Sequence, residues 1–174
     1  MADWRDVLLV DGYNMIGGWP FLAKLAKVSM QEARDGLLER LADYQAFSGL
    51  RVIAIFDAYL VPGIGKSFTQ GKVQVYFTKE KETADECIER LVVEFSHRRR
   101  KIYVATSDLM EQHVIFALGA LRIPARELLS QIEQSEQEVK RRIREDRERS
   151  QRNTLEGKVS DNILQQLERW RREK

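Results

Sequence analysis

Three aspartates in this sequence stand at the ends of short, unbroken apolar segments. They are Asp11 after residues 7–10, Asp57 after residues 52–56, and Asp108 shortly after residues 102–106. Apolar segments of this length are typical of parallel strands buried on both faces. The carboxyl ends of parallel strands share one edge of a sheet, where open α/β folds bind ligands. We therefore expect the three carboxylates to converge at one sheet edge.

A fourth acid, Asp85, lies near the start of a helix predicted from residue 83 to residue 97. Thr83 and Glu86 have the spacing of a capping box, which marks the first turn of that helix. The apolar side chains that follow at helical spacing define a buried face. Asp85 falls on the rim of this face, whereas Glu86 points to solvent. The helix phase therefore selects Asp85, and not Glu86, as the fourth member of the cluster.

Clustered carboxylates repel one another, and burying them is costly unless a cation is present. Mg²⁺ and Mn²⁺ prefer oxygen ligands, and such an ion can polarise a phosphoryl oxygen and activate water. Asn14 adds an amide that could position a phosphate without adding charge, and Gly12 would let the backbone approach a ligand. Each aspartate alone also fits a helix cap or a turn, above all Asp108 beside Ser107. Only the combination of acids favours a metal site.

The segments between the acids predict the elements that would position them. Ser29 and Glu32 open a helix to about residue 47, and a short helix is expected within residues 15–27. The order strand, helix, strand implies a right-handed parallel crossover. Residues 58–71 are predicted to be a loop, and the alternating residues 72–78 a strand at or near a sheet edge.

Two further helical segments complete the predicted fold. The helix after Asp108 should carry Val114, Ile115 and Leu118 inward. The residues after 130 form highly charged helices with a thin apolar stripe. We therefore predict a three-layer α/β domain with a mostly parallel central sheet over residues 1–130, and a charged helical C-terminal extension over residues 131–174.

Composition narrows the class of protein. The 174 residues are 43% hydrophobic and 32% charged, with a formal net charge of +2. This balance neither requires nor excludes nucleic acid as a partner. A single cysteine, Cys87, cannot form an internal disulfide and suits a reducing compartment. No apolar segment is long enough to span a bilayer, and the first residues lack the pattern of a signal peptide. We expect a cytoplasmic protein without a membrane partner.

Basic residues near the predicted loop are candidates for holding phosphates. Lys66 and Lys72 follow Asp57 in the chain, so we expect them near the acidic edge, where they would hold the phosphates of a substrate. The basic residues 98–101 precede a strand that ends at the acids and should lie at the opposite edge. Gly65, Lys66 and Ser67 mimic the end of a phosphate-binding P-loop, but Leu60 stands where the first glycine belongs, so we reject that motif.

Several motifs together resemble the YacP-like branch of the NYN domains, which are relatives of the PIN nucleases. The resemblance covers roughly residues 5–130, and its motifs occur in the right order and spacing: Asp11-Gly12-Tyr13-Asn14, Phe56-Asp57-Ala58, Phe77-Thr78-Lys79-Glu80, Thr83-Ala84-Asp85 and Ala105-Thr106-Ser107-Asp108. It implies a PIN-like fold with an acidic site for Mg²⁺ or Mn²⁺. By this resemblance Asp11, Asp85 and Asp108 would organise the metal, with Asn14 and Asp57 beside them.

The same resemblance implies a metal-dependent endoribonuclease that cleaves messenger RNA, in association with the ribosome. Two other functions stay open on the sequence. One is an RNA- or ribosome-binding module with little or no catalysis, in which the acids are structural. The other is a small-molecule phosphohydrolase, although Asp11 lacks the second aspartate two residues on that a phosphoaspartate mechanism would use.

Overall fold

The computed structural model describes residues 4–58, 68–70, 72–79, 81–96, 100–152 and 161–172. The chain divides into two compact units, Met1–Glu136 and Gln137–Lys174. The expected domain boundary after residue 130 lies inside a long helix, α6 (Ala125–Arg152), that belongs partly to each unit. None of the helices in the described ranges is long and apolar enough to cross a membrane.

The first unit is built on a sheet whose strands follow the order β3-β4-β2-β1-β5-β6. The strands are β1 (Val7–Asp11), β2 (Arg51–Phe56), β3 (Phe68–Gln70), β4 (Val73–Phe77), β5 (Ile102–Ala105) and β6 (Leu121–Ile123). All neighbouring pairs are parallel except β3 with β4, which is antiparallel. The prediction of a mostly parallel sheet is confirmed. Strand β3, however, lies within the segment that we expected to be a loop.

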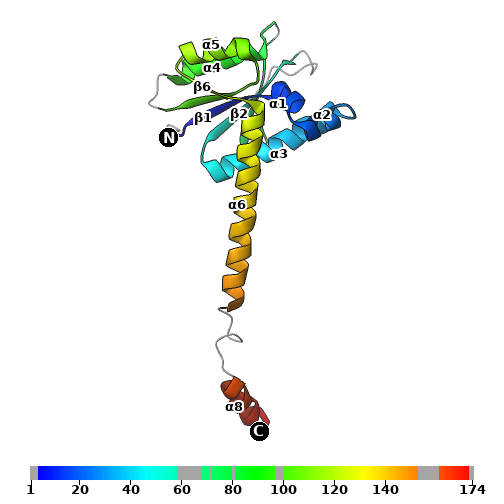
Figure 1. Cartoon of the computed structure of the whole chain (residues 1–174), viewed down its shortest axis with the longest axis vertical. Helices are drawn as coiled ribbons and strands as arrows, with labels where there is room; N and C mark the ends of the chain where they lie inside the picture. Colours follow the sequence, from blue (N-terminus) through cyan, green and yellow to red (C-terminus); the bar gives the residue numbers. More distant parts are fainter. Residues whose placement is uncertain are drawn as a thin grey trace. The chain divides into compact units, whose positions relative to one another are not determined.

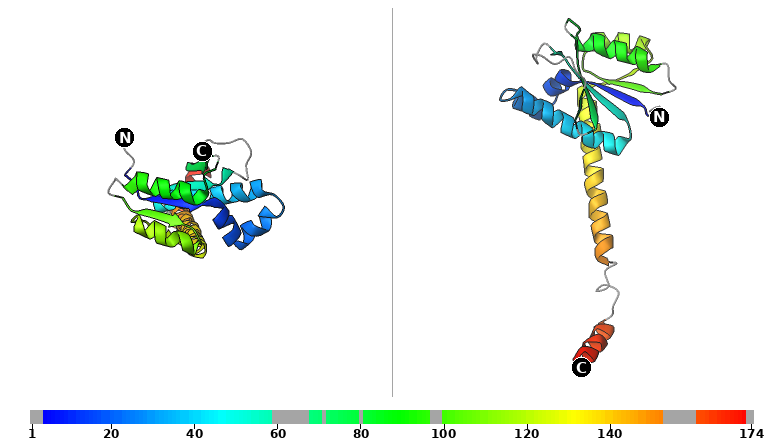
Figure 2. Two further views of the ribbon diagram at one scale, coloured as in Figure 1. Left: turned by 90° about the horizontal axis from the view of Figure 1, so that it is seen from above. Right: turned by 180° about the vertical axis from the view of Figure 1, so that it is seen from behind.

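Helices cover both faces of this sheet, as Figures 1 and 2 show. One face packs against α1 (Gly12–Gly18), α2 (Pro20–Ala26), α3 (Met30–Ser48) and the start of α6, and the other against α4 (Ala84–Ser96) and α5 (Leu109–Ala117). Within β1, Leu8 and Val10 belong to the first core, whereas Val7 and Leu9 belong to the second. The three-layer α/β fold is therefore confirmed. This alternation also points Asp11 to the face of α4 and α5.

Two helices, and not one, connect β1 to α3. Helix α1 begins directly at Gly12 and ends before Trp19, whose extended backbone separates it from α2. Pro20 then occupies the first turn of α2, where a missing N–H costs nothing. The indole of Trp19 is fully buried, and its Nε1 donates a hydrogen bond to the Ala125 carbonyl at 2.8 Å. This bond ties the break between α1 and α2 to the start of α6.

The caps predicted for α3 and α4 form as expected. The Ser29 hydroxyl accepts a hydrogen bond from the Glu32 N–H at 3.2 Å. In α4 the capping box is reciprocal, because the Thr83 hydroxyl accepts from the Glu86 N–H and the Glu86 carboxylate accepts from the Thr83 N–H. These bonds fix the first turn of α4, and with it the position of Asp85, at the carboxyl edge of the sheet.

Helix α5 faces the core as expected at Ile115 and Leu118, but not at Val114. Ile115 is fully buried and Leu118 packs against the same core, but Val114 is 40% exposed. The helix is apolar on nearly all sides, so periodicity alone did not fix its inner face. The position facing inward in the first turn is that of Glu111, which is only 5% exposed.

Helix α6 contributes to both units. Ala125, Leu128 and Ile132 are buried in the core beneath the sheet. Glu136, at the end of the first unit, forms a 3.0 Å ion pair with Arg40 of α3. Within the second unit, i,i+4 ion pairs such as Arg141–Glu145 line the rest of α6. The second unit also contains α8 (Asp161–Arg172), the other part of the expected charged extension.

Candidate metal centre

The site is built at the carboxyl edge of the sheet, beginning with Asp11 at the end of β1. Asp11 is 9% exposed, and its Oδ1 accepts a hydrogen bond from the Asn14 N–H at 3.0 Å. This hydrogen bond caps α1. Burial raises the pKa of Asp11 to about 6, and the nearby charge of Asp85 acts in the same direction against the stabilising N–H of Asn14. Asp11 is therefore both a helix cap and a carboxylate under electrostatic strain.

Asp85 reaches this edge from the first turn of α4. It is half-buried, whereas its neighbour Glu86 is exposed and occupied by the capping box. Burial raises the pKa of Asp85, and the negative charges of Asp108 and Asp57 raise it further. The helix phase inferred from the apolar stripe therefore places these two acids correctly.

Glu111 is the member of the site that the sequence interpretation missed. Neither of its carboxylate oxygens has a hydrogen-bond partner among the described residues, although the residue is almost fully buried. Burial raises the pKa of Glu111 to about 7, opposed in part by the nearby Thr106 hydroxyl and reinforced by Asp85 and Asp11. A buried carboxyl without a partner is costly, so its presence calls for a ligand or a proton.

Asp11, Asp85 and Glu111 together form a tight cluster. One carboxylate oxygen of each residue lies within 4.8 Å of the others. Three like charges at this separation disfavour one another's ionisation, which agrees with the raised pKa of every member. A divalent cation would reverse this balance by neutralising the charge and by satisfying the Glu111 oxygens. The donor set is purely oxygen, which suits Mg²⁺ or Mn²⁺.

The other two predicted acids lie around this cluster. Asp108 is exposed and caps α5, because its Oδ1 accepts a hydrogen bond from the Met110 N–H at 2.8 Å. It stays close enough to raise the pKa values of Asp11 and Asp85. Asp57 directly follows β2 and is half-buried. Its Oδ1 accepts a hydrogen bond from the Thr78 hydroxyl at 3.5 Å, and its charge raises the pKa of Asp85. The structure thus brings all four predicted acids to one edge.

Asn14 joins two of the loops that carry the acids. Its side-chain Oδ1 accepts a hydrogen bond from the Ser107 N–H at 2.8 Å. Ser107 in turn accepts a hydrogen bond through Oγ from the Ala125 N–H at 3.1 Å. The amide of Asn14 therefore holds the loop after β5 against the start of α1. This gives Asn14 a structural role in positioning the site.

Packing requires a glycine at position 12. We had expected that the approach of the backbone to a ligand would require it. A Cβ at this position would overlap the ring of Phe56. The Phe56 ring is fully buried and contacts Tyr13 edge-on, with 5.2 Å between ring centroids. Glycine therefore allows α1 to start directly above β2.

The two predicted RNA-binding lysines do not both meet the acids. Lys66 lies outside the described residues. Lys72 is exposed and precedes β4, which runs parallel to β2, so Lys72 lies at the edge of the sheet opposite the acids. Its carbonyl accepts a hydrogen bond from Gln45, near the end of α3. We therefore do not include Lys72 among the groups that hold RNA at the site.

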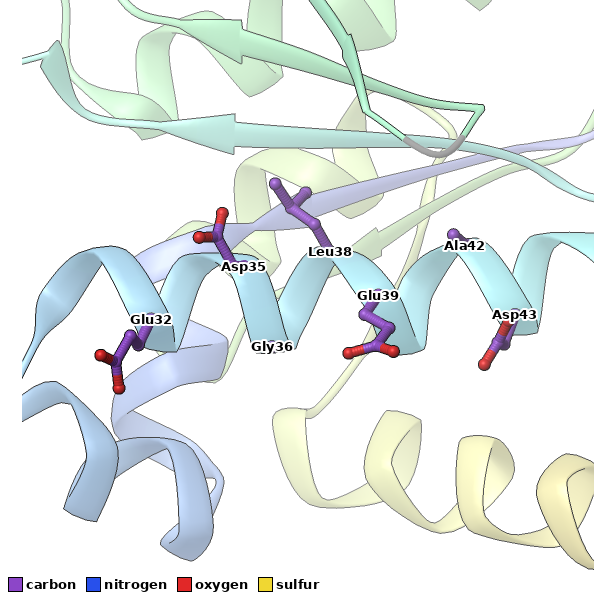
Figure 3. A pocket seen from close by; sticks show the side chains of 7 residues that line it. All are labelled: Glu32, Asp35, Gly36, Leu38, Glu39, Ala42 and Asp43. Atoms are coloured by element: carbon purple, nitrogen blue, oxygen red, sulfur yellow. The ribbon is translucent and has the colours of Figure 1, made fainter.

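A second acidic group lies on α3, around a surface hollow lined by residues of that helix alone (Figure 3). Its acids are Glu32, Asp35, Glu39 and Asp43. Figure 3 shows Asp35 on one side of the helix and Glu32, Glu39 and Asp43 on another, so these carboxylates do not converge. This hollow lacks the arrangement of a metal centre.

A mostly parallel sheet with acids gathered at its carboxyl edge defines an open α/β protein whose chemistry would occur at that edge. The chain belongs to the YacP-like NYN domain family, whose model matches residues 8–172. The family match supports a PIN-like nuclease fold and confirms the resemblance seen in the motifs. It also extends through the C-terminal extension, beyond the range of 5–130 that the motifs covered.

Similar proteins with known structures come from Bacillus subtilis. The chain is 48% identical to the protein described as uncharacterized protein YacP from strain 168, over 96% of this chain and 97% of that protein. It is 47% identical in sequence to the protein in the crystal structure of Rae1 (YacP) from this organism. The two structures match with a TM-score of 0.73, over 96% of this chain and 95% of the other. A mutant form of Rae1 matches with a TM-score of 0.72 and 49% identity, over 80% of this chain and 82% of the other.

Proposed function

We propose that this protein is a divalent-metal-dependent endoribonuclease that hydrolyses phosphodiester bonds of RNA at the Asp11, Asp85 and Glu111 cluster. The observation that carries this proposal is the unpartnered, buried Glu111 carboxylate within 4.8 Å of two further acids. The YacP-like NYN family, with its PIN-like nuclease fold, supports the same chemistry.

Each residue of the site has a defined part in this proposal. Asp11, Asp85 and Glu111 would hold Mg²⁺ or Mn²⁺, which supplies positive charge to the phosphate and activates water. Asp108 and Asp57 add negative charge around the cluster and strengthen cation binding. Asn14 holds the loop of Ser107 and Asp108 in position relative to Asp11, because its Oδ1 accepts a 2.8 Å hydrogen bond from the Ser107 N–H.

We further propose that the substrate is messenger RNA, that the ribosome is a partner and that the protein acts in the cytoplasm. The family resemblance supports the first two statements. The third is supported by Cys87, which is buried and free. A single buried thiol suits a reducing compartment.

Cleavage of a labelled single-stranded RNA in the presence and absence of Mn²⁺ tests the enzymatic proposal. We expect cleavage with Mn²⁺, none with chelator, and a loss of at least about 100-fold in Asp85→Asn, as for the removal of other strong electrostatic groups. Glu86→Gln is the matched control, because Glu86 neighbours Asp85 but is exposed and engaged in the cap. Equal losses in both variants would contradict the assignment of Asp85.

Thermal unfolding with added metal separates a nuclease from a binding module in which the acids are structural. A cation that binds only the folded state raises the melting temperature through linkage. We expect Mn²⁺ to stabilise the wild type, and Asp11→Asn to abolish this shift. A wild type that binds RNA but neither responds to Mn²⁺ nor cleaves RNA would favour the RNA- or ribosome-binding module.

A further inference from the structure

Helix α5, which carries Glu111 of the proposed metal centre, also has an exposed apolar face. Leu109 is 67% exposed and Phe116 is 74% exposed, although both are large apolar residues. They lie seven residues apart, with Gln112 between them at spacings of three and four, so the three side chains share one side of the helix. Glu111 points to the opposite, buried side. One short helix thus carries a site acid inside and an apolar stripe outside.

A positive charge is fixed against this stripe. Arg122 of β6 donates from Nε to the Thr106 carbonyl at 3.0 Å and from Nη1 to the Gln112 side chain at 2.9 Å. Both acceptors are neutral, and Arg122 forms no ion pair with any acid in the described ranges. Its guanidinium is therefore oriented but not neutralised. An arginine held in this way is suited to bind a phosphate.

We propose that the stripe of Leu109, Gln112 and Phe116, together with Arg122, binds the single-stranded RNA segment that flanks the scissile phosphate. Bases would pack on Phe116 and Leu109, and a neighbouring phosphate would contact the Arg122 guanidinium. Aromatic stacking next to an uncompensated cation is the usual composition of a single-strand binding surface. This inference rests on the proposed function, because it places the RNA path beside the acid cluster.

Continuity with the acids favours RNA over a protein partner as the occupant. The stripe begins at Leu109, the residue after Asp108, in the first turn of the helix that also carries Glu111. Thr106, which orients Arg122, is the residue whose hydroxyl accepts from the Asp108 N–H and lies near Glu111. Helix α5 and Thr106 therefore connect the stripe and the Arg122 guanidinium to the acids within the part of the chain that the structure describes.

Fluorescence anisotropy of a short labelled single-stranded RNA tests this surface without cleavage, in a background of Asp85→Asn. We expect Phe116→Ala to weaken RNA binding by roughly 5- to 100-fold, the range for loss of one stacked base. Phe47→Ala is the matched control, because Phe47 is 41% exposed on α3, against the other face of the sheet, and its variant should bind normally.

The contribution of Arg122 is measured by the dependence of the RNA affinity on salt. Arg122→Gln should weaken binding and reduce the slope of log affinity against log salt by about 0.7, the value for one phosphate contact on a single strand. Lys72→Gln, an equal change of charge at an exposed residue on the edge of the sheet opposite the acids, should leave the slope unchanged. Arg122→Lys keeps the charge and should keep the slope, while the loss of the fixed fork still weakens affinity.

The outcomes separate this inference from the proposed function. Unchanged RNA affinity in both Phe116→Ala and Arg122→Gln would overturn the inference, even if the wild type cleaves RNA. If Phe116→Ala changes the oligomeric state in size-exclusion chromatography and leaves RNA affinity unchanged, the face is a protein interface and the inference is wrong. If the variants weaken binding as expected but the wild type does not cleave, the surface stands and the enzymatic proposal fails.

Discussion

The fold raises the pKa values of two carboxyl groups in the acid cluster, those of Asp11 and Glu111. Burial raises the pKa of Asp11 to about 6 and that of Glu111 to about 7. A carboxyl whose pKa is higher in the folded state than in the unfolded state binds its proton more tightly when folded. The free energy of unfolding therefore falls as the pH rises through the interval between the two values. For Glu111 this interval runs from 4.5 to about 7.

Glu111→Gln should remove this pH-dependent loss of stability. Without metal, the variant should equal the wild type near pH 5 and exceed it at pH 8, by about 1–3 kcal/mol in the free energy of unfolding. Chemical unfolding in chelator at several pH values measures the difference. Glu94→Gln, which alters an exposed acid of α4, should follow the wild type throughout. Identical pH profiles for Glu111→Gln and the wild type would show that Glu111 is not strained.

Asp108 combines a cap with a negative charge, and substitutions can separate these two roles. Asp108→Asn keeps an oxygen that accepts from the Met110 N–H, so stability should hardly change. The lost charge should lower RNA cleavage, but less than Asp85→Asn does, because Asp108 lies outside the group of three within 4.8 Å. Asp108→Ala should lower cleavage further and cost about 1 kcal/mol of stability through the lost cap.

The measurement for both Asp108 variants is the Mn²⁺-dependent cleavage rate beside the melting temperature. If Asp108→Asn cleaves RNA like the wild type, Asp108 is a cap alone. A loss as large as that of Asp85→Asn would instead make Asp108 a direct metal ligand, as the family resemblance implied.

At the scale of elements, the sequence predicted what depends on strong local signals. Continuous apolar strands and capping boxes gave β1, β2, β5, α3 and α4, and they placed Asp11, Asp57 and Asp85 correctly at one edge. Asp85 could be distinguished from Glu86 because α4 has a sharp division between apolar and polar faces. In each case the local pattern and the tertiary contacts favour the same arrangement.

Helix α5 shows why Glu111 was missed. Glu111 precedes Ile115 by four residues and Leu118 by seven, so the helix phase does place it on the inner face. The apolar residues of α5, however, surround the helix, and Val114 was expected to point inward as well. Because Val114 follows Glu111 by three residues, the expected inner face in fact includes Glu111. Glu111 was missed because we looked for acids only at strand ends and at the start of α4. The same uniform apolarity leaves Leu109 and Phe116 exposed and marks the stripe that we assign to RNA.

The position of Lys72 depends on a pairing that the sequence signals weakly. Strand β3 has only three residues, Phe68–Gln70, and pairs antiparallel with β4. Because β4 runs parallel to β2, its start lies at the edge opposite the acids. Nearness to Asp57 along the chain therefore does not bring Lys72 near the acids in space. Single positions in connections between strands cannot be placed before the strand pairing is known.

At the scale of the whole chain, the contacts of α6 determine where the folded core ends. Its first part is indispensable, because Leu128 and Ile132 are fully buried and Ala125 accepts the Trp19 hydrogen bond. The contacts of Glu136 with Arg40 complete this part. Beyond it, the apolar residues Val139 and Ile143 of the same helix are 39% and 48% exposed. The tertiary contacts thus support a core that ends within α6.

We predict that a chain ending at residue 140 keeps the fold and the Mn²⁺-dependent cleavage of a short free RNA. Its melting temperature should stay within a few degrees of that of the full chain, because residues 141–174 supply none of the core residues described here.

A chain ending at residue 124 is the matched comparison. It lacks Leu128 and Ile132, and the loss of such large buried side chains costs about 2–5 kcal/mol each, enough to unfold a domain of ordinary stability. Circular dichroism and the cleavage rate of both chains test this division. Loss of structure in the longer chain would show that the second unit stabilises the first. Loss of cleavage with structure intact would give residues 141–174 a part in handling RNA.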